Sequence, residues 1–404
     1  MKIMKIMKIT RLAGALIVAA GLNSLMVASS QAQDIKLGFN GDISASPTAQ
    51  AGQSGVLGLQ AAIEDVNAKG GVLGRKLALV IRDDLSQPPK SIQIMSELID
   101  NEKVVAIFGP SNSGNAMAWK HLPNSKKVPV IVPIATGTDI TKAAGADNYM
   151  FRVSMVDRDN IVGLMAYVKN NPASKKIGYM AETTGYGQGG LKDIQEIGDL
   201  HGIKPVAVEK FGVADTDMTS QLNKMKAAGV DTIVVWSQST PTGQLFRSME
   251  KLNYFPLTLT SWVADQDGFF NAAGKSLAER PIFIRTIPGN LTPRLQKFYD
   301  RIVPKMSSPT APLAQAAHAY DSVMLLVAAI NQAKSTDGAK IHDALENLQT
   351  PYEGIMKTYD KPFSKTQHEG LTPKDFHWVK WQNGKIVSYE DSTIKSVKES
   401  DFKR

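Results

Sequence analysis

Short apolar runs alternate with amphipathic stretches along most of the chain. From Asp34 onward, each β-branched, apolar run is followed by a turn rich in glycine, serine or aspartate, and then by apolar positions three or four residues apart. The runs have the character of buried strands, and the stretches that of amphipathic helices. Strands separated by helices of 10 to 15 residues predict parallel sheets with right-handed crossovers. The pattern therefore predicts an α/β fold.

The elements fall into two series, which predict two doubly wound parallel sheets. In the first series, strands are expected at 35–39, 77–81, 104–108 and 128–132, with helices near 48–68, 91–100 and 115–122. In the second, strands are expected at 176–180, 205–211, 232–236 and 257–261, with helices near 160–169, 190–200 and 218–228 and another that ends at Leu252. Each series is long enough to form a lobe with its own core.

The remainder of the chain is expected to complete these two lobes. It contains one strand at 281–287, three helices within 292–348, and short strands near Ile355 and Trp378. Three crossovers between lobes are then expected, near Phe151, Arg285 and Tyr352. This predicts lobe I from residues 33–151 plus 286–352, and lobe II from residues 152–285 plus 353–404.

The first 32 residues are typical of a cleavable signal peptide. Four positive charges precede an apolar run that starts at Leu12, and Ser30-Gln31-Ala32 places small side chains where a signal peptidase requires them. We expect cleavage after Ala32 and a periplasmic location. A membrane anchor is the alternative, but the run is shorter than the roughly 20 residues that a span needs, and no later run reaches that length.

Composition narrows the function classes. The chain has 404 residues and no cysteine, which excludes thiol catalysis, disulfides and attachment of a lipid to an N-terminal cysteine. Its net charge of +8 includes the four leader charges, so the mature chain carries only +4 and does not suggest a nucleic-acid partner. The six histidines lack paired metal-ligand spacing, so we expect no metal site and no cofactor.

One motif favours a different function. Gly185 to Gly190 satisfies the G-x-G-x-x-G pattern, follows a predicted strand, and has Glu209 about twenty residues further on. This arrangement is typical of dinucleotide binding, so an exported NAD-dependent oxidoreductase is one alternative. The other interpretation is a glycine-rich turn that lets Tyr186 project into a cleft. No G-x-S-x-G motif supports a hydrolase.

Two hydroxyl-bearing turns point to anion binding. Residues 109–114, which include Ser113, leave one buried strand and enter a helix, and residues 133–138, which include Thr136, leave the neighbouring strand. Free backbone N–H groups and hydroxyls at such N-terminal turns bind anions. Together the two turns predict a site for one carboxylate, with ordinary N-capping by serine and threonine as the alternative.

Several segments, in order, resemble the leucine/isoleucine/valine-type periplasmic binding proteins of ABC importers over essentially the whole mature length. They are Lys36 to Phe39, Ala61 to Leu77, Arg82-Asp83-Asp84, Val105 to Pro110, Phe151-Arg152 with Asp157, and Tyr186-Gly187. The resemblance implies a type I fold with a ligand cleft between the lobes, and a domain closure that a membrane permease recognises. It places Ser113 and Thr136 on the carboxylate-binding hydroxyls, Ile134 on a backbone contact, and Tyr186 on the aromatic that closes from the second lobe.

The resemblance also shows departures. Trp262 stands where the amino-acid binders of this family place an acidic residue to pair the ligand ammonium, and Asp265 is the candidate replacement. Ala51 stands where an aromatic residue is frequent, which would enlarge the pocket. With their neighbours Asn112, Ala135 and Gln238, these residues complete the expected ligand-binding set.

We therefore expect a non-enzymatic, monomeric solute receptor that binds a small carboxylate by hinge closure and passes it to an inner-membrane ABC permease. An apolar amino acid is the favoured ligand. Three alternatives remain open: an aromatic or aliphatic carboxylate without an amine, the NAD-dependent oxidoreductase, and a sensory module that reports to a receptor instead of a permease.

Overall fold

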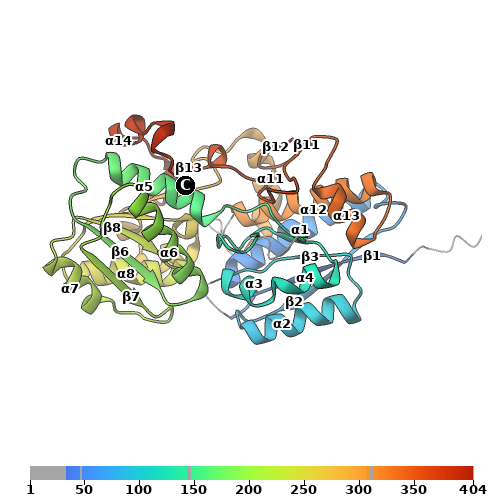
Figure 1. Cartoon of the computed structure of the whole chain (residues 1–404), viewed down its shortest axis with the longest axis horizontal. Coiled ribbons are helices and arrows are strands. Elements are labelled where there is room, and N and C mark those ends of the chain that lie inside the picture. The colour runs from blue at the N-terminus through green and yellow to red at the C-terminus, as the bar shows by residue number, and fades with distance from the viewer. Residues whose placement is uncertain (1–32, 46–47, 143–146, 307, 309–312, 404) are drawn as a thin grey trace, which may run out of the picture. The chain divides into compact units, whose positions relative to one another are not determined.

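The computed structural model describes residues 33–45, 48–142, 147–306, 308 and 313–403. The predicted signal peptide and its expected cleavage site lie outside these residues. Within the described part, the chain builds two large sheets, each with helices on both faces, and one small two-stranded sheet (Figure 1).

The first sheet has five parallel strands. In spatial order they are β2 (Leu77–Asp83), β1 (Ile35–Gly41), β3 (Ala106–Phe108), β4 (Val130–Val132) and β5 (Met150–Arg152). Four of them were predicted. The fifth, β5, was missed as a strand because three residues are too few to show a period.

Side chains along these strands point alternately into two separate hydrophobic cores. Ile35, Leu37 and Phe39 of β1 face the core formed with α1 (Ala49–Ala68), α12 (Leu313–Ala333) and α13 (Gly338–Leu345). Val130 and Val132 of β4 face the opposite core, whose helices are α2 (Pro88–Ser96) and α3 (Ser113–Trp119), the latter followed by α4 (His121–Lys126). Because successive side chains in a strand point to opposite faces, every strand serves both cores. Because the five strands are parallel, their carboxyl ends lie at one edge of the sheet, where they can carry a binding site.

The second sheet has seven strands, of which the two last in the chain run antiparallel to their neighbours. In spatial order they are β14 (Lys385–Ser388), β13 (His377–Gln382), β10 (Ile282–Arg285), β9 (Leu257–Thr260), β8 (Thr232–Trp236), β6 (Ile177–Glu182) and β7 (Ala207–Phe211). Helices α5 (Asp157–Asn170) and α6 (Gly185–Leu200) pack on one face. Helices α7 (Thr219–Ala227), α8 (Ser239–Lys251) and α9 (Asp267–Ala273) pack on the other. Two doubly wound sheets were predicted, and the α/β fold class is confirmed.

Five further elements complete the fold: α10 (Lys275–Ala278), α11 (Pro293–Ile302), β11 (Tyr352–Glu353), β12 (Thr358–Tyr359) and α14 (Ser392–Ser396). Strands β11 and β12 pair with each other as the two-stranded sheet. Phe363 and Leu371 remain buried in the core of the first sheet, and β13 of the second sheet begins only at His377. The last crossover therefore follows Leu371, later than the position near Tyr352 that was expected.

Helix α12 is long and apolar enough to cross a membrane, by length and composition alone. A helix was predicted in this region, but Gln315, His318 and Asp321 interrupt its apolar run, so no span was expected here. Most of the helix is buried against α1 and the first sheet. Its apolar character is therefore that of a core helix.

Candidate functional site

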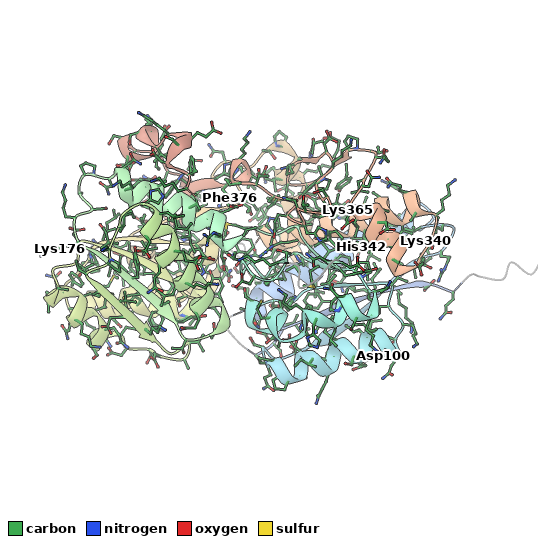
Figure 2. The ribbon with its side chains drawn as sticks, in the orientation of Figure 1. Asp100, Lys176, Lys340, His342, Lys365 and Phe376 are labelled. Atoms are coloured by element: carbon green, nitrogen blue, oxygen red, sulfur yellow. The ribbon has the colours of Figure 1, made fainter. Side chains whose placement is uncertain are left out.

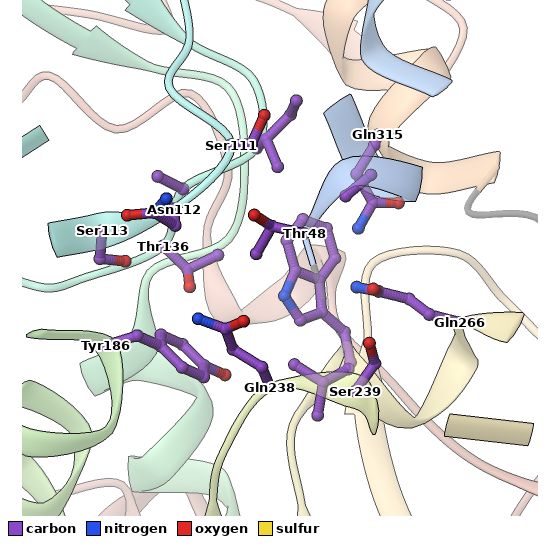
Figure 3. Close-up of a pocket in the computed structure, with 15 residues that line it drawn as sticks. Thr48, Ser111, Asn112, Ser113, Thr136, Tyr186, Gln238, Ser239, Gln266 and Gln315 are labelled. Atoms are coloured by element: carbon purple, nitrogen blue, oxygen red, sulfur yellow. The ribbon is translucent and has the colours of Figure 1, made fainter. Parts of the chain in front are cut away.

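A cavity lies where the first sheet's strand ends meet residues of the second sheet's lobe (Figure 3). The space between its walls that is free of protein atoms is about 420 Å³, part of it open to solvent, and only about 40 Å³ of it is available to the centre of a water-sized sphere. One wall comes from the start of α1, the turns after β3 and β4, and the start of α12. The other comes from α6, α8 and the turn after β9. The described lining residues are Thr48, Ala51, Ser111, Asn112, Ser113, Ile134, Ala135, Thr136, Tyr186, Gln238, Ser239, Trp262, Val263, Gln266 and Gln315.

The structure brings nine of the ten predicted site residues to this cavity: Ala51, Asn112, Ser113, Ile134, Ala135, Thr136, Tyr186, Gln238 and Trp262. They come from both sheets and from segments more than two hundred residues apart. Their part in binding a ligand stays a prediction, because no ligand is present.

Ser113 and its neighbours form the first wall. Asn112 caps α3, since its side-chain oxygen accepts a hydrogen bond of 2.9 Å from the backbone N–H of Asn115. Ser113 Oγ accepts a hydrogen bond of 3.0 Å from the N–H of Gly137. This bond ties the two predicted turns together and leaves the hydroxyl hydrogen of Ser113 available as a donor. The two turns thus form one polar surface.

The turn that carries Thr136 differs from the prediction. It follows β4 directly, but residues 133–142, all described, contain no helix, so only the turn at Ser113 is a helix N-terminus. The backbone oxygen of Thr136 instead accepts a hydrogen bond of 2.9 Å from the N–H of Asp157, the first residue of α5. Thr136 is therefore held by the neighbouring segment that crosses to the second sheet.

The second wall carries two aromatic rings beside polar side chains. Tyr186 lies in the first turn of α6, and its hydroxyl is 2.7 Å from Ser261 Oγ. Trp262 follows at the start of a 3₁₀ turn and stacks on His318, with ring centroids 5.6 Å apart. Both Tyr186 and Trp262 are buried. These contacts orient the two rings as a rigid cover opposite Ser113 and Thr136.

Side-chain amides are the part of the site that sequence reasoning missed. Gln266 and Gln315 also line the cavity, and Figure 3 shows them on the side away from Ser113 and Thr136. Gln315 is fully buried, yet neither its side-chain nitrogen nor its oxygen has a hydrogen-bond partner among the residues that the structure describes. Gln238 Oε1 is likewise buried without a partner. A buried amide without partners is costly, which indicates that these atoms are arranged for a ligand or for water.

Asp265 does not reach this cavity. It borders a separate cavity with Arg285 and Trp381, and its Oδ2 lies 3.9 Å from Arg285 Nη1. Burial raises the pKa of Asp265 to about 7. The expected replacement for an acidic partner of the ligand is therefore wrong, because the 3₁₀ turn directs Trp262 into the cavity and Asp265 away from it. The described residues that line the cavity include no charged side chain.

The glycine motif has a packing role. A Cβ at Gly187 would lie 2.1 Å from the Glu182 oxygen, and one at Gly190 would lie 1.9 Å from the Trp236 ring. Both positions are inside α6, which begins at Gly185, so the motif is not a loop before the helix. Glu209, the expected ribose partner, pairs with Lys224 at 2.9 Å. The close approach of α6 to β6 and β8 thus accounts for these glycines.

Two doubly wound lobes around one small, polar cavity define the class of two-lobed ligand-binding proteins. Comparisons with known proteins identify the family. The periplasmic binding protein family model matches residues 34–385, and the chain belongs to that family. The predicted family is confirmed.

The chain is similar to a Leu/Ile/Val-binding protein, BraC3, of Rhizobium johnstonii, with 26% identity over 363 residues that cover 88% of this chain and 94% of the relative. Among solved structures it is similar to a type 1 periplasmic binding protein of Bordetella pertussis, with a TM-score of 0.78, 24% identity and coverage of 88% and 99%. It is also similar to an ABC transporter solute-binding protein of R. palustris in complex with 4-hydroxybenzoate, with a TM-score of 0.72, 21% identity and coverage of 89% and 96%. These structural likenesses show that the chain has the type I periplasmic binding protein fold.

Proposed function

We propose that this protein is the non-enzymatic, periplasmic receptor of an ABC importer, and that it binds one small carboxylate in the cavity and delivers it to an inner-membrane permease. The observation that carries the proposal is the meeting of the Ser113 and Thr136 turns at one cavity, covered by Tyr186 and Trp262. The family supports the transport role. A sensory role would use the same cavity with a different partner.

Uncharged donors can hold a carboxylate in this cavity. The Ser113 hydroxyl and the polar groups of Thr136 lie on one wall, and charge-assisted hydrogen bonds contribute about 1.5–3 kcal/mol each where water is excluded. A fixed positive side chain is not required for this mode of binding. Two such bonds account for binding in the micromolar range once the aromatic cover adds its contacts.

The ligand proposed here lacks a free ammonium group. No acidic side chain is among the described lining residues, and none of the residues outside the description is Asp or Glu. A buried ammonium without an anionic partner costs several kcal/mol. This favours an aromatic or aliphatic carboxylate without an amine over the apolar amino acid that the sequence analysis preferred. The R. palustris neighbour with 4-hydroxybenzoate supports this ligand class.

An apolar amino acid is the second candidate. The Rhizobium relative, a Leu/Ile/Val-binding protein, supports it, and the face of Trp262 offers a cation–π contact of about 1–2 kcal/mol to an ammonium group. That contact is smaller than the cost of leaving the ammonium without an anion. The amino acid is therefore placed second.

A ligand panel tests both candidates. Isothermal titration and thermal unfolding would compare benzoate, 4-hydroxybenzoate and short aliphatic acids with leucine, isoleucine and valine, each at millimolar concentration. We expect the acids to raise the melting temperature and the amino acids to leave it unchanged. The opposite result would reject the amine-free ligand and retain the receptor, whereas no response to any carboxylate would reject the carboxylate site.

Hinge closure is the mechanism that we propose for capture. Residues of the two lobes already touch beside the cavity, since Gln50 Nε2 donates to Asp267 Oδ2 at 2.8 Å and Thr138 bonds to Asp193. Small-angle X-ray scattering should show a smaller radius of gyration with ligand than without it. The NAD-dependent oxidoreductase is the rival, and co-purified nicotinamide absorbance would support that rival instead.

A further inference from the structure

Two histidines and a glutamate that are far apart in the sequence come together on the first sheet's side of the molecule. His342 lies on α13, Glu346 caps the end of that helix, and His368 follows in the segment that leads to β13. Figure 2 marks His342 in the part that carries the first sheet, away from Lys176 on the second sheet. The side chains of the three residues are only 7%, 10% and 3% exposed, respectively. None of them borders the ligand cavity.

The hydrogen bonds on the far side of each ring define the tautomers. His368 Nδ1 lies 2.9 Å from the backbone oxygen of Met150, and His342 Nδ1 lies 3.1 Å from a carboxylate oxygen of Asp343. Both partners are acceptors only, so each Nδ1 carries a hydrogen. In a neutral ring the Nε2 atom then presents a lone pair. Both Nε2 atoms point their lone pairs at the same carboxylate.

That arrangement favours a cation between the three side chains. Glu346 Oε1 lies 3.2 Å from His368 Nε2, at hydrogen-bond distance, and 3.3 Å from His342 Nε2, which has no hydrogen-bond partner among the described residues. One hydrogen on His368 Nε2 would satisfy only the first of these two contacts, whereas a metal ion between the three atoms would bind all of them.

The spacing matches a metal ion. Zn²⁺ holds nitrogen and oxygen ligands at about 2.0–2.1 Å, so two ligand atoms of a tetrahedral site lie about 3.3 Å apart. The two contacts to Glu346 have that length, and all three ligand atoms lie within 4.8 Å of one another. The acceptors on the Nδ1 atoms are the partners that orient histidine ligands in metal sites.

We propose that His342, Glu346 and His368 bind a divalent transition-metal ion, with Zn²⁺ as the best match and water as the fourth ligand. The ion fastens the segment around His368, which pairs with β5 through Arg152, onto α13. The role of the ion is structural, because it holds the segment around His368 against the first sheet just before the chain crosses to the second sheet for the last time. This proposal does not depend on the ligand of the cavity.

The test uses the full mature chain, purified without a polyhistidine tag and stripped with a chelator. Titration calorimetry with Zn²⁺ alone should show one ion per chain with a Kd below about 1 µM. Saturating Zn²⁺ should raise the melting temperature by roughly 3 °C at a hundred times the Kd. Co²⁺ in its place should give the intense visible absorption of tetrahedral cobalt.

Matched variants separate the site from adventitious binding. Glu346→Gln and His368→Gln should weaken Zn²⁺ binding by about 100-fold or more, and Asp343→Asn, which removes the outer partner of His342, by about 10-fold. The control is His121→Gln at an exposed histidine, which should bind like the parent chain. If His368→Gln does not fold by circular dichroism, Glu346→Gln carries the test. Absent saturable binding, or equal binding by Glu346→Gln and the parent, would overturn the proposal.

Discussion

The two walls of the cavity are built from different chemistry. The first-sheet wall offers hydroxyls and backbone groups at Ser113 and Thr136, which are locked together by the Gly137 N–H. The second-lobe wall offers the rings of Tyr186 and Trp262. Hydrogen-bond donors at fixed positions recognise a charged head, whereas flat apolar surfaces recognise whatever body the head carries. From this difference we expect the first wall to define the ligand class and the second wall to select among its members.

The largest effect is expected on the first wall. The double substitution Ser113→Ala with Thr136→Val should weaken carboxylate binding by at least about 100-fold, because it removes two charge-assisted hydrogen bonds of about 1.5–3 kcal/mol each. Titration calorimetry measures the loss. The free energy of unfolding should fall by about 1–3 kcal/mol, since the bond from Gly137 to Ser113 and the contact of Thr136 with the Asp157 carboxyl are lost from the protein itself.

The matched control for that double variant is Ser248→Ala with Thr258→Val. Both side chains are buried and donate to backbone oxygens, and neither they nor those partners border the cavity. The control should lose stability and retain its affinity. Undiminished affinity in the Ser113 and Thr136 variant would show that the first wall is not the carboxylate site.

The variant Trp262→Leu tests whether the second wall selects among carboxylates. Removing the ring should weaken the binding of aromatic acids by about 10- to 100-fold, because stacking and burial are lost. The binding of short aliphatic acids should weaken less. The ratio of the two affinities, measured by calorimetry, reports the selectivity of the second wall. An equal loss for both ligand types would contradict an aromatic cover. Trp378→Leu, on β13 and away from the cavity, is the control.

Asp157 lies behind Thr136, and its titration should make the stability of the protein depend on pH. Burial raises the pKa of Asp157 from 3.8 to about 7. The folded state therefore retains a proton that the unfolded chain releases, so this residue contributes stability below pH 4 that is lost as pH rises through 7. We expect the melting temperature to fall by roughly 3–5 °C between pH 5 and pH 8, and to fall less in Asp157→Asn. Parallel curves for the two proteins would refute the assignment.

The smallest effect is expected for Gln315→Met on the side away from Ser113. Because neither amide atom of Gln315 has a partner, an apolar side chain of similar size should stabilise the ligand-free protein by about 1 kcal/mol. The same change should weaken the binding of 4-hydroxybenzoate more than that of benzoate if the Gln315 amide pairs with a polar group of the ligand that is far from the carboxylate. Thermal unfolding and calorimetry give the two values. A destabilised ligand-free protein would show that the amide has a structural partner.

Local pattern predicted most of the fold, and its failures are informative. Strand β5 was missed because Met150 to Arg152 is too short to show a period. The last crossover was placed too early because Phe363 and Leu371 do not form a regular element, yet both are buried under the first sheet. The burial of a residue outside a regular element depends on the distant surface that it contacts. Periodicity along the sequence cannot predict that contact.

The binding residues could be predicted where they follow strand ends. Ser113 and Thr136 come directly after buried parallel strands, and neighbouring parallel strands end at the same edge. Gln315 could not be placed in the same way, because it lies on a helix from the far end of the chain. A glutamine within the apolar run of α12 was the one available indication.

The sequence by itself determined the order of the elements, the two doubly wound sheets, the family and the polar turns of the first wall, because each depends on residues close together in the chain. Only the tertiary structure decided that Trp262 faces the cavity while Asp265 faces away, that Gln315 reaches it, and that His342 meets His368. These outcomes depend on how helices and turns are rotated when they pack, and packing is a property of surfaces that the chain brings together from hundreds of residues apart.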